Sequence, residues 1–113
     1  SEPRSSLVLY QTADGRTRVQ CRFEEQTVWL TQAQMAELFA TTPQNITQHL
    51  KAIYEDRELL EDATCKPYLL VRLEGARRVE RAVLHYSLPA ILAVGYRVRS
   101  PRGTQFRQWA TAR

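Results

Sequence analysis

A group of polar side chains on one predicted helix is the part of this sequence whose types and spacing best suggest chemistry. At about 100° per residue, Ile46, Leu50 and Ile53 fall on one face of a helix that begins at Pro43. The other side carries the candidate base-reading residues Gln44, Thr47, Gln48 and Lys51, with Asn45 on its flank. Glutamine and asparagine present a donor and an acceptor on one plane and can pair bidentately with adenine in the major groove. An ordinary solvated helix face is the alternative interpretation.

Basic residues are concentrated in the last third of the chain. The net charge is +4, but residues 75–113 hold eight arginines against Glu80 alone, a net charge of +7. Such a region suits a polyanion, and we therefore expect double-stranded DNA as the partner. The candidate backbone-binding residues are Arg77, Arg78, Arg81, Arg99, Arg102 and Arg107. Two alternatives stay open: the first three could guard an edge strand, and the later arginines, including Arg97, could pair with acidic residues at 55–62.

Signals for other chemistries are weak. The two histidines, His49 and His85, have no Ser, Cys or carboxylate at a recognisable catalytic spacing, and no Gly-rich phosphate loop occurs. Cys21 and Cys65 lack metal-ligand and redox spacings, so we expect free thiols. The sequence thus predicts neither an enzyme nor a cofactor or metal site.

Length and hydropathy predict one cytoplasmic domain. No apolar run approaches the ~20 residues of a membrane span, and no signal peptide is recognisable, so no membrane partner is expected. We expect a disordered lead-in at residues 1–6 and a single domain over residues 7–113. Because the chain starts with Ser1 and stops inside a predicted helix, we also expect it to be a fragment of a longer protein.

Two capped helices are predicted to position the amide face. Thr31 is a good N-cap, and Gln34 three residues later can complete a capping box. An apolar stripe over residues 35–39 follows. Thr42 then caps the second helix, whose first position is held by Pro43. This pattern is typical of a helix-turn-helix with a three-residue turn.

Strand-like segments flank the helix pair. Residues 7–10, 19–23 and 27–30 predict a small antiparallel meander, with a turn at Ala13–Gly15, a second at Glu24-Glu25, and Trp29 in the core. After the second helix, residues 55–62 are acidic and helix-favouring, and we expect them to face away from DNA. Residues 66–74 and 77–84 then predict a β-hairpin across Gly75-Ala76, the order expected of a wing.

Two further helices are predicted near the end of the chain. Ser87 and Pro89 mark the start of the first, and Ser100 caps the second, which runs through Phe106 and Trp109. Gly95 could allow a close helix crossing. The apolar residues expected to place the first of these helices in the core are Ile91, Leu92, Val94 and Tyr96.

Four stretches carry a family resemblance. They are Trp29–Phe39, Asn45-Ile46, His85–Leu88 and, above all, the long stretch Val94–Ala110. With these stretches the chain resembles the N-terminal domain of the virulence RhuM family from Leu7 onward, and it is more distantly similar to the N-terminal DNA-binding domains of KilA-type and BRO-type phage antirepressors. The resemblance implies a DNA-binding protein. Some family members are linked to mobile elements and some are fused to Fic-type domains, whose His-Pro-Phe motif is absent here.

The sequence therefore predicts an α+β, winged helix-turn-helix-like domain with an N-terminal β-meander, a β-hairpin wing and two C-terminal helices. The predicted function is DNA binding in transcriptional regulation or in a mobile-element or virulence context. A protein-interaction or oligomerisation module without base readout is the alternative. A homodimer and a fused C-terminal domain are open options for further partners.

Overall fold

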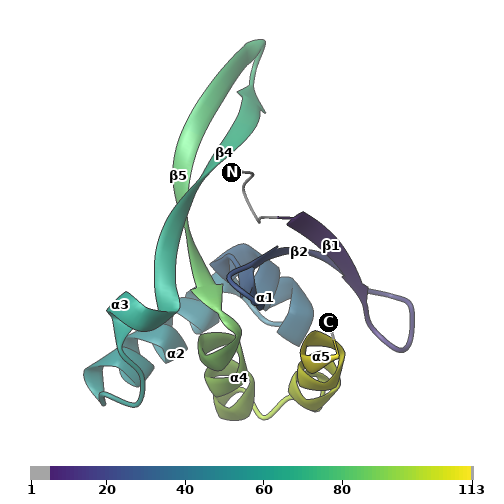
Figure 1. Cartoon of the computed structure of the whole chain (residues 1–113), viewed down its shortest axis with the longest axis vertical. Coiled ribbons are helices and arrows are strands. Elements are labelled where there is room, and N and C mark those ends of the chain that lie inside the picture. Colours follow the sequence, from purple (N-terminus) through teal and green to yellow (C-terminus); the bar gives the residue numbers. More distant parts are fainter. Residues whose placement is uncertain (1–5, 113) are drawn as a thin grey trace.

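The computed structural model of the chain describes residues 6–112. Over this range the protein is a mixed α+β domain, in which an antiparallel sheet of five strands in the order β1-β2-β3-β5-β4 is combined with five helices. Figure 1 shows the helices grouped together while the β4–β5 hairpin rises away from them. The elements are β1 (Ser6–Gln11), β2 (Arg18–Glu24), β3 (Thr27–Leu30), α1 (Gln32–Phe39), α2 (Pro43–Glu55), α3 (Glu61–Thr64), β4 (Cys65–Glu74), β5 (Arg77–Ser87), α4 (Leu88–Arg97) and α5 (Arg102–Thr111).

The N-terminal strands form the predicted meander. β1 pairs with β2, and β2 pairs with β3, in antiparallel register. Gly15 takes a positive φ of 74° in the first turn, as a tight hairpin requires. The second turn lies at Glu25 and Gln26, which both have positive φ, one residue later than predicted. Ser6 belongs to β1 rather than to the predicted lead-in, and residues 1–5 of that lead-in lie outside the described residues.

The helix pair begins and ends where the caps predict. The Thr31 hydroxyl accepts a hydrogen bond from the Gln34 backbone N–H at 3.1 Å, and the Gln34 side chain accepts one from the Thr31 N–H at 2.8 Å. This reciprocal capping box satisfies two amides that helix geometry leaves open. The Thr42 hydroxyl caps α2 by accepting from the Asn45 N–H at 3.1 Å. Between the helices, Ala40 adopts the left-handed conformation and ends α1.

The acidic run after α2 does not form the helix that its composition favours. α2 ends at Glu55, and Arg57 takes a positive φ of 58°. The Glu58 N–H reaches back to the Ile53 carbonyl at 3.0 Å, so the chain closes the helix with a left-handed cap. Only the short helix α3 follows before β4 begins.

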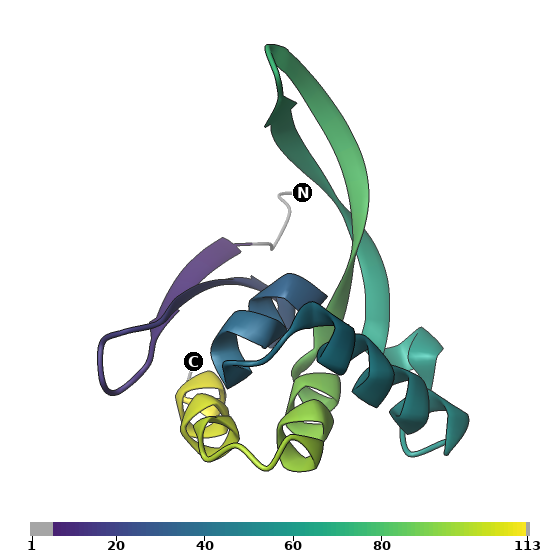
Figure 2. The ribbon, with the colours of Figure 1, turned by 180° about the vertical axis from the view of Figure 1, so that it is seen from behind.

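The β4–β5 hairpin is joined to the rest of the sheet only at its base. β5 pairs with β3 through Trp29↔Ser87 and Leu30↔Tyr86, whereas β4 and β5 pair with each other along ten residue pairs. Gly75 supplies the positive φ of 65° that the turn needs. Most of the hairpin therefore projects from the domain, which Figures 1 and 2 show from opposite sides.

Helices α4 and α5 cross closely through two glycines. A Cβ on Gly95 would lie 2.9 Å from Cζ of Phe39 and 3.6 Å from the Gly103 Cα. The absence of a side chain at Gly95 thus lets the Phe39 ring seat against α4, as the predicted close crossing requires. Ser87 occupies the N-cap position of α4, but its hydroxyl makes no capping hydrogen bond. Ser100 lies just outside α5 and accepts from the Arg102 N–H at 3.2 Å.

The core lies between β1–β3 and the four longer helices, and two aromatic predictions about it need correction. Tyr96 is 83% exposed, because it points away from the α4 face that buries Ile91 and Val94. Trp29 is buried as predicted, but alternation along β3 places it on the face of the sheet opposite to Leu30, where its ring meets Tyr68. Within residues 6–112, no helix combines the length and the apolar character needed to cross a bilayer.

Candidate nucleic-acid interface

The polar face of α2 is presented to solvent at one end of the helical group. Ile46, Leu50 and Ile53 are buried beneath the helix, whereas Gln44, Gln48 and Lys51 are exposed. Within the described residues, none of these three side chains takes part in a hydrogen bond or ion pair. In Figure 2, α2 lies in front of α4 and extends away from α1. Two amides one helical turn apart are therefore available to an external partner.

Two of the five candidate base-reading residues are instead engaged within the protein. The Asn45 side-chain amide donates to the Thr41 hydroxyl at 2.8 Å. The Thr47 hydroxyl lies 2.6 Å from the Gln32 side-chain oxygen, and the Gln32 amide donates in turn to the Tyr86 hydroxyl at 3.0 Å. This chain of contacts joins α2 to α1 and β5. Sequence reasoning missed it because Gln32 is 15 residues before Thr47 and belongs to another helix.

A cleft of about 900 Å³ opens beside α2, between α4 and α5. His49 lines it from α2, while Arg99, from the turn after α4, and Arg107, from α5, line it from the other side. Both arginines are exposed and make no ion pair with any described residue. Tyr96, Ser100 and Thr104 add hydroxyl groups to the walls. The cleft is also lined by Glu58, which is paired with Arg97, so its net positive charge comes from Arg99 and Arg107. Together with the hydroxyl groups, these two arginines make a composition that suits an oxyanion.

Arg97, in contrast, is compensated within the fold. Its guanidinium lies 3.0 Å from a Glu58 carboxylate oxygen and 3.3 Å from an Asp56 oxygen. The hydrogen bond that Arg97 donates to Glu58, and to a smaller extent the one it donates to Asp56, raises the pKa of Arg97. The internal pairing that the sequence left open for the C-terminal arginines is therefore correct for Arg97.

Arg102 serves a structural role that the sequence did not indicate. Its guanidinium donates to the Leu38 backbone carbonyl at 3.0 Å, near the C-terminal end of α1, and lies 3.8 Å from an Asp14 carboxylate oxygen. These contacts join α5 to α1 and to the β1–β2 turn. The side chain is half-buried in this position, so Arg102 is not among the arginines left open to a phosphate.

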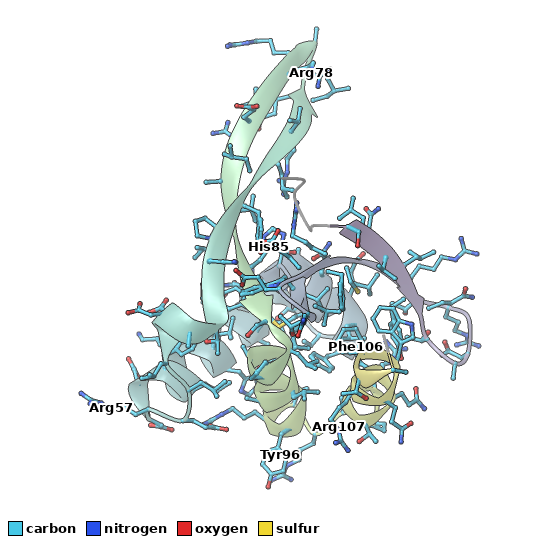
Figure 3. The ribbon with its side chains drawn as sticks, viewed as in Figure 1. Arg57, Arg78, His85, Tyr96, Phe106 and Arg107 are labelled. Carbon is cyan, nitrogen blue, oxygen red and sulfur yellow. The ribbon has the colours of Figure 1, made fainter. Side chains whose placement is uncertain are left out.

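The three hairpin arginines have different surroundings. Arg81 makes a bidentate contact with Glu74, at 2.8 and 3.0 Å, and this contact lowers the pKa of the Glu74 carboxyl. Arg77 shares that face of the hairpin, whereas Arg78 lies on the opposite face because neighbouring residues alternate along a strand. Both are exposed at the hairpin end, where Figure 3 labels Arg78.

An aromatic cluster anchors the hairpin base on the side of the sheet away from the helices. The Tyr68 ring lies 4.9 Å from His85 and 6.0 Å from Trp29, and the Arg22 guanidinium stacks 4.3 Å from its centre. Burial raises the pKa of Tyr68 to about 12 and lowers the pKa of His85. Nδ1 of His85 lies 2.9 Å from the Val83 carbonyl oxygen, so this histidine is a buried, hydrogen-bonded residue. Cys21 and Cys65 are thiols that take no part in a disulfide, as predicted.

Comparison with known proteins supports the predicted resemblance over the C-terminal part of the chain. Residues 63–113 match the family model described as the virulence protein RhuM family. This segment covers the whole hairpin together with α4 and α5. No curated protein and no solved structure matches the chain.

Proposed function

We propose that this chain, a RhuM family sequence over residues 63–113, is a winged helix-turn-helix domain that binds double-stranded DNA. In this proposal α1 and α2 are the helix-turn-helix, α2 is the recognition helix, and the β4–β5 hairpin is the wing. The single observation that carries the proposal is the exposed amide face of α2 beside a cleft with two uncompensated arginines. The function is binding, without an enzymatic step.

Gln44 and Gln48 are the proposed base-reading pair. They are four positions apart, which is about 6 Å along a helix axis, so their amides could address neighbouring base pairs. Recognition helices commonly use their N-terminal residues for base contacts, and both glutamines lie in the N-terminal half of α2. Lys51 follows one turn later on the same face.

Charge favours one placement of the duplex along α2. The C-terminal end of the helix carries Glu55 and leads to Asp56 and Glu58, which would repel phosphate wherever Arg97 does not compensate them. Sequence reasoning overlooked that Glu55 shares the exposed side of α2. We therefore place the DNA over the N-terminal half of the helix and the mouth of the cleft, where Arg99 and Arg107 would bind backbone phosphates.

A comparison of Gln48→Ala with Arg107→Ala tests this division of roles. Loss of a bidentate base contact is worth ~1 to 3 kcal/mol of discrimination, so Gln48→Ala should change the sequences selected from randomised duplexes. Arg107→Ala should weaken binding to all sequences alike and reduce the slope of log K against log salt by about 0.9. If wild type and Gln48→Ala select the same sequences with the same affinity, α2 does not read bases.

Arg99→Gly separates phosphate binding from stability. Arg99 follows α4 with a positive φ of 56°, a conformation that glycine adopts at lower cost than arginine. The substitution should therefore raise the thermal midpoint while it weakens DNA binding at low salt. Opposite changes in the two measurements would support a functional reason for arginine at this position. Unchanged DNA affinity would remove Arg99 from the proposed interface.

The alternative function, a protein-interaction module, has one observation in its favour, the exposed apolar side chains of the hairpin. These side chains do not compete with α2 for a partner. They concern a separate surface, and both activities could operate in one domain.

A further inference from the structure

One face of the β4–β5 hairpin carries large apolar side chains that nothing in the described part of the chain covers. Leu69, Val71 and Leu73 alternate along β4 and are 65%, 52% and 74% exposed. The register of the hairpin places Leu84 of β5 on the same face, opposite Pro67, and this leucine is 48% exposed. We call these four residues, Leu69, Val71, Leu73 and Leu84, the hairpin stripe.

The hairpin stripe is costly to leave in water. Burial of apolar surface is favourable, and monomeric soluble proteins rarely expose contiguous apolar patches larger than a few hundred Å². The hairpin receives little support elsewhere, because only its base pairs with β3, and two-stranded ribbons are marginally stable alone. A partner that covers the stripe would stabilise both the side chains and the ribbon.

The charged residues on the same face point to the identity of that partner. Arg78 lies opposite Leu73, and Glu80 lies opposite Val71, so the face has an apolar column on β4 and a charged pair on β5. Neither charge forms an ion pair with any described residue. On the other face, Glu74 and Arg81 already compensate each other. Arg78 and Glu80 are two residues apart, which is about 7 Å along a strand.

This arrangement is complementary to itself. A two-fold axis that crosses the hairpin between the levels of Arg78 and Glu80 would turn a second hairpin antiparallel to the first. The axis would bring Arg78 of each copy opposite the partner's Glu80, and Leu73 of each copy opposite the partner's Val71. Two-fold interfaces use one surface patch in this reciprocal way. We propose that the outer part of the hairpin stripe, Val71 and Leu73, together with Arg78 and Glu80, binds the same surface of a second copy of this chain.

The small area of the proposed interface indicates a weak dimer. The two hairpins would overlap only near their tips, so each copy would bury much less than the ~800 Å² per partner of a standard interface. We therefore expect association that depends strongly on protein concentration. Antiparallel hairpins would direct the two helical groups away from each other, so the polar face of α2 would stay accessible in both copies. DNA is a poor occupant of the stripe because leucine and valine offer no donors and Glu80 would repel phosphate.

Sedimentation velocity of the 113-residue chain over a wide concentration range, without DNA, is the first test. Wild type should shift from monomer to dimer as concentration rises, and Leu73→Lys should weaken dimerisation at least tenfold. Leu60→Lys is the matched control, because Leu60 is 68% exposed but lies outside the hairpin, before α3. It should dimerise as wild type does. Circular dichroism would verify that both variants are folded.

Charge exchange provides the second test and identifies the partner as the same surface. Arg78→Glu and Glu80→Arg should each weaken the dimer, because each places like charges opposite one another across the two-fold axis. The double variant should recover most of the wild-type affinity, because it restores opposite charges with exchanged signs. A wild-type chain that stays monomeric at millimolar concentration would overturn the proposal. A double variant no better than either single variant would overturn it as well.

Discussion

The α1–α2 pair and the β4–β5 hairpin are of similar length, but they relate to the core in opposite ways. The helix pair buries Met35, Leu38 and Ile46 completely and exposes a polar surface. The hairpin is buried only at its base and exposes leucines along most of its length. The comparison shows that the proposed base-reading element packs against the core along its length, whereas most of the proposed wing has no packing partner within the described part of the domain.

The largest difference between the two regions should appear on truncation of equivalent leucines. Leu38 is fully buried, so Leu38→Ala should lower the free energy of unfolding by ~2 to 5 kcal/mol. Leu73 is 74% exposed, so Leu73→Ala should change it by less than ~0.5 kcal/mol in dilute solution. Urea unfolding at low protein concentration would measure both. Similar losses would mean that the hairpin stripe is covered within the monomer.

Gly95 offers a test of how tightly the helical group is packed. Gly95→Ala would place a Cβ 2.9 Å from the Phe39 ring, and overpacking of this kind costs ~1 to 3 kcal/mol. Phe39→Leu in the same chain should recover part of that loss because it removes the ring atoms in conflict. Thermal unfolding of the two single variants and the double variant would detect this coupling. Simple additivity would show that the contact with Phe39 is not the cause.

Substitution of the two N-cap threonines should lower the free energy of unfolding by a smaller amount, which should differ between the two helices. Thr31 takes part in a reciprocal capping box and is buried, whereas Thr42 accepts one hydrogen bond and is exposed. Loss of an N-cap typically costs ~1 kcal/mol of stability. The loss in the free energy of unfolding should be larger than this for Thr31→Ala and smaller for Thr42→Ala. Chemical denaturation of both variants would rank them. The reverse order would mean that burial of the Thr31 hydroxyl does not strengthen the hydrogen bond it accepts from the Gln34 N–H.

The smallest expected effect is a pH dependence that originates at the hairpin base. Burial, with a contribution from nearby Arg22, lowers the pKa of His85 below its ordinary value, while the contact with Val83 opposes the shift. As the pH falls, the imidazole at position 85 is therefore protonated at a higher pH in the unfolded chain than in the folded protein. The free energy of unfolding should decline as the pH falls below about 6.5. Above that pH this contribution should be constant. His85→Gln should flatten this part of the stability profile in urea unfolding, and equal slopes in both proteins would exclude His85 as the cause.

Features that depend on neighbours within a few residues were predictable from the sequence. Thr31, Thr42 and Pro43 define helix starts through contacts with residues no more than four positions away, and Gly75 marks the hairpin turn in the same manner. The order of strands and helices followed from such signals. The winged arrangement and its partner remain proposals, because no local signal specifies what lies against the α2 surface.

Features that depend on distant partners were not predictable. Arg102 contacts Leu38 across 64 positions, and this contact turned a candidate phosphate ligand into a support between helices. The exposure of Tyr96 depends on how α4 rotates over the core, which its apolar composition does not specify. The hairpin was recognised from strand-like alternation, but that pattern does not show whether either face is covered.

The contacts from Thr47 through Gln32 to Tyr86 have a consequence for the evolution of sequence preference. They make the rotation of α2 about its own axis depend on a residue of β5. A recognition helix held in this way loses little conformational entropy when a partner binds. Under the proposed function, a substitution at Gln32 would therefore change which base pairs Gln44 and Gln48 reach, although Gln32 belongs to α1. If α2 reads bases as proposed, chains that differ from this one only at position 32 would prefer other sequences while keeping the same residues on the exposed face of α2.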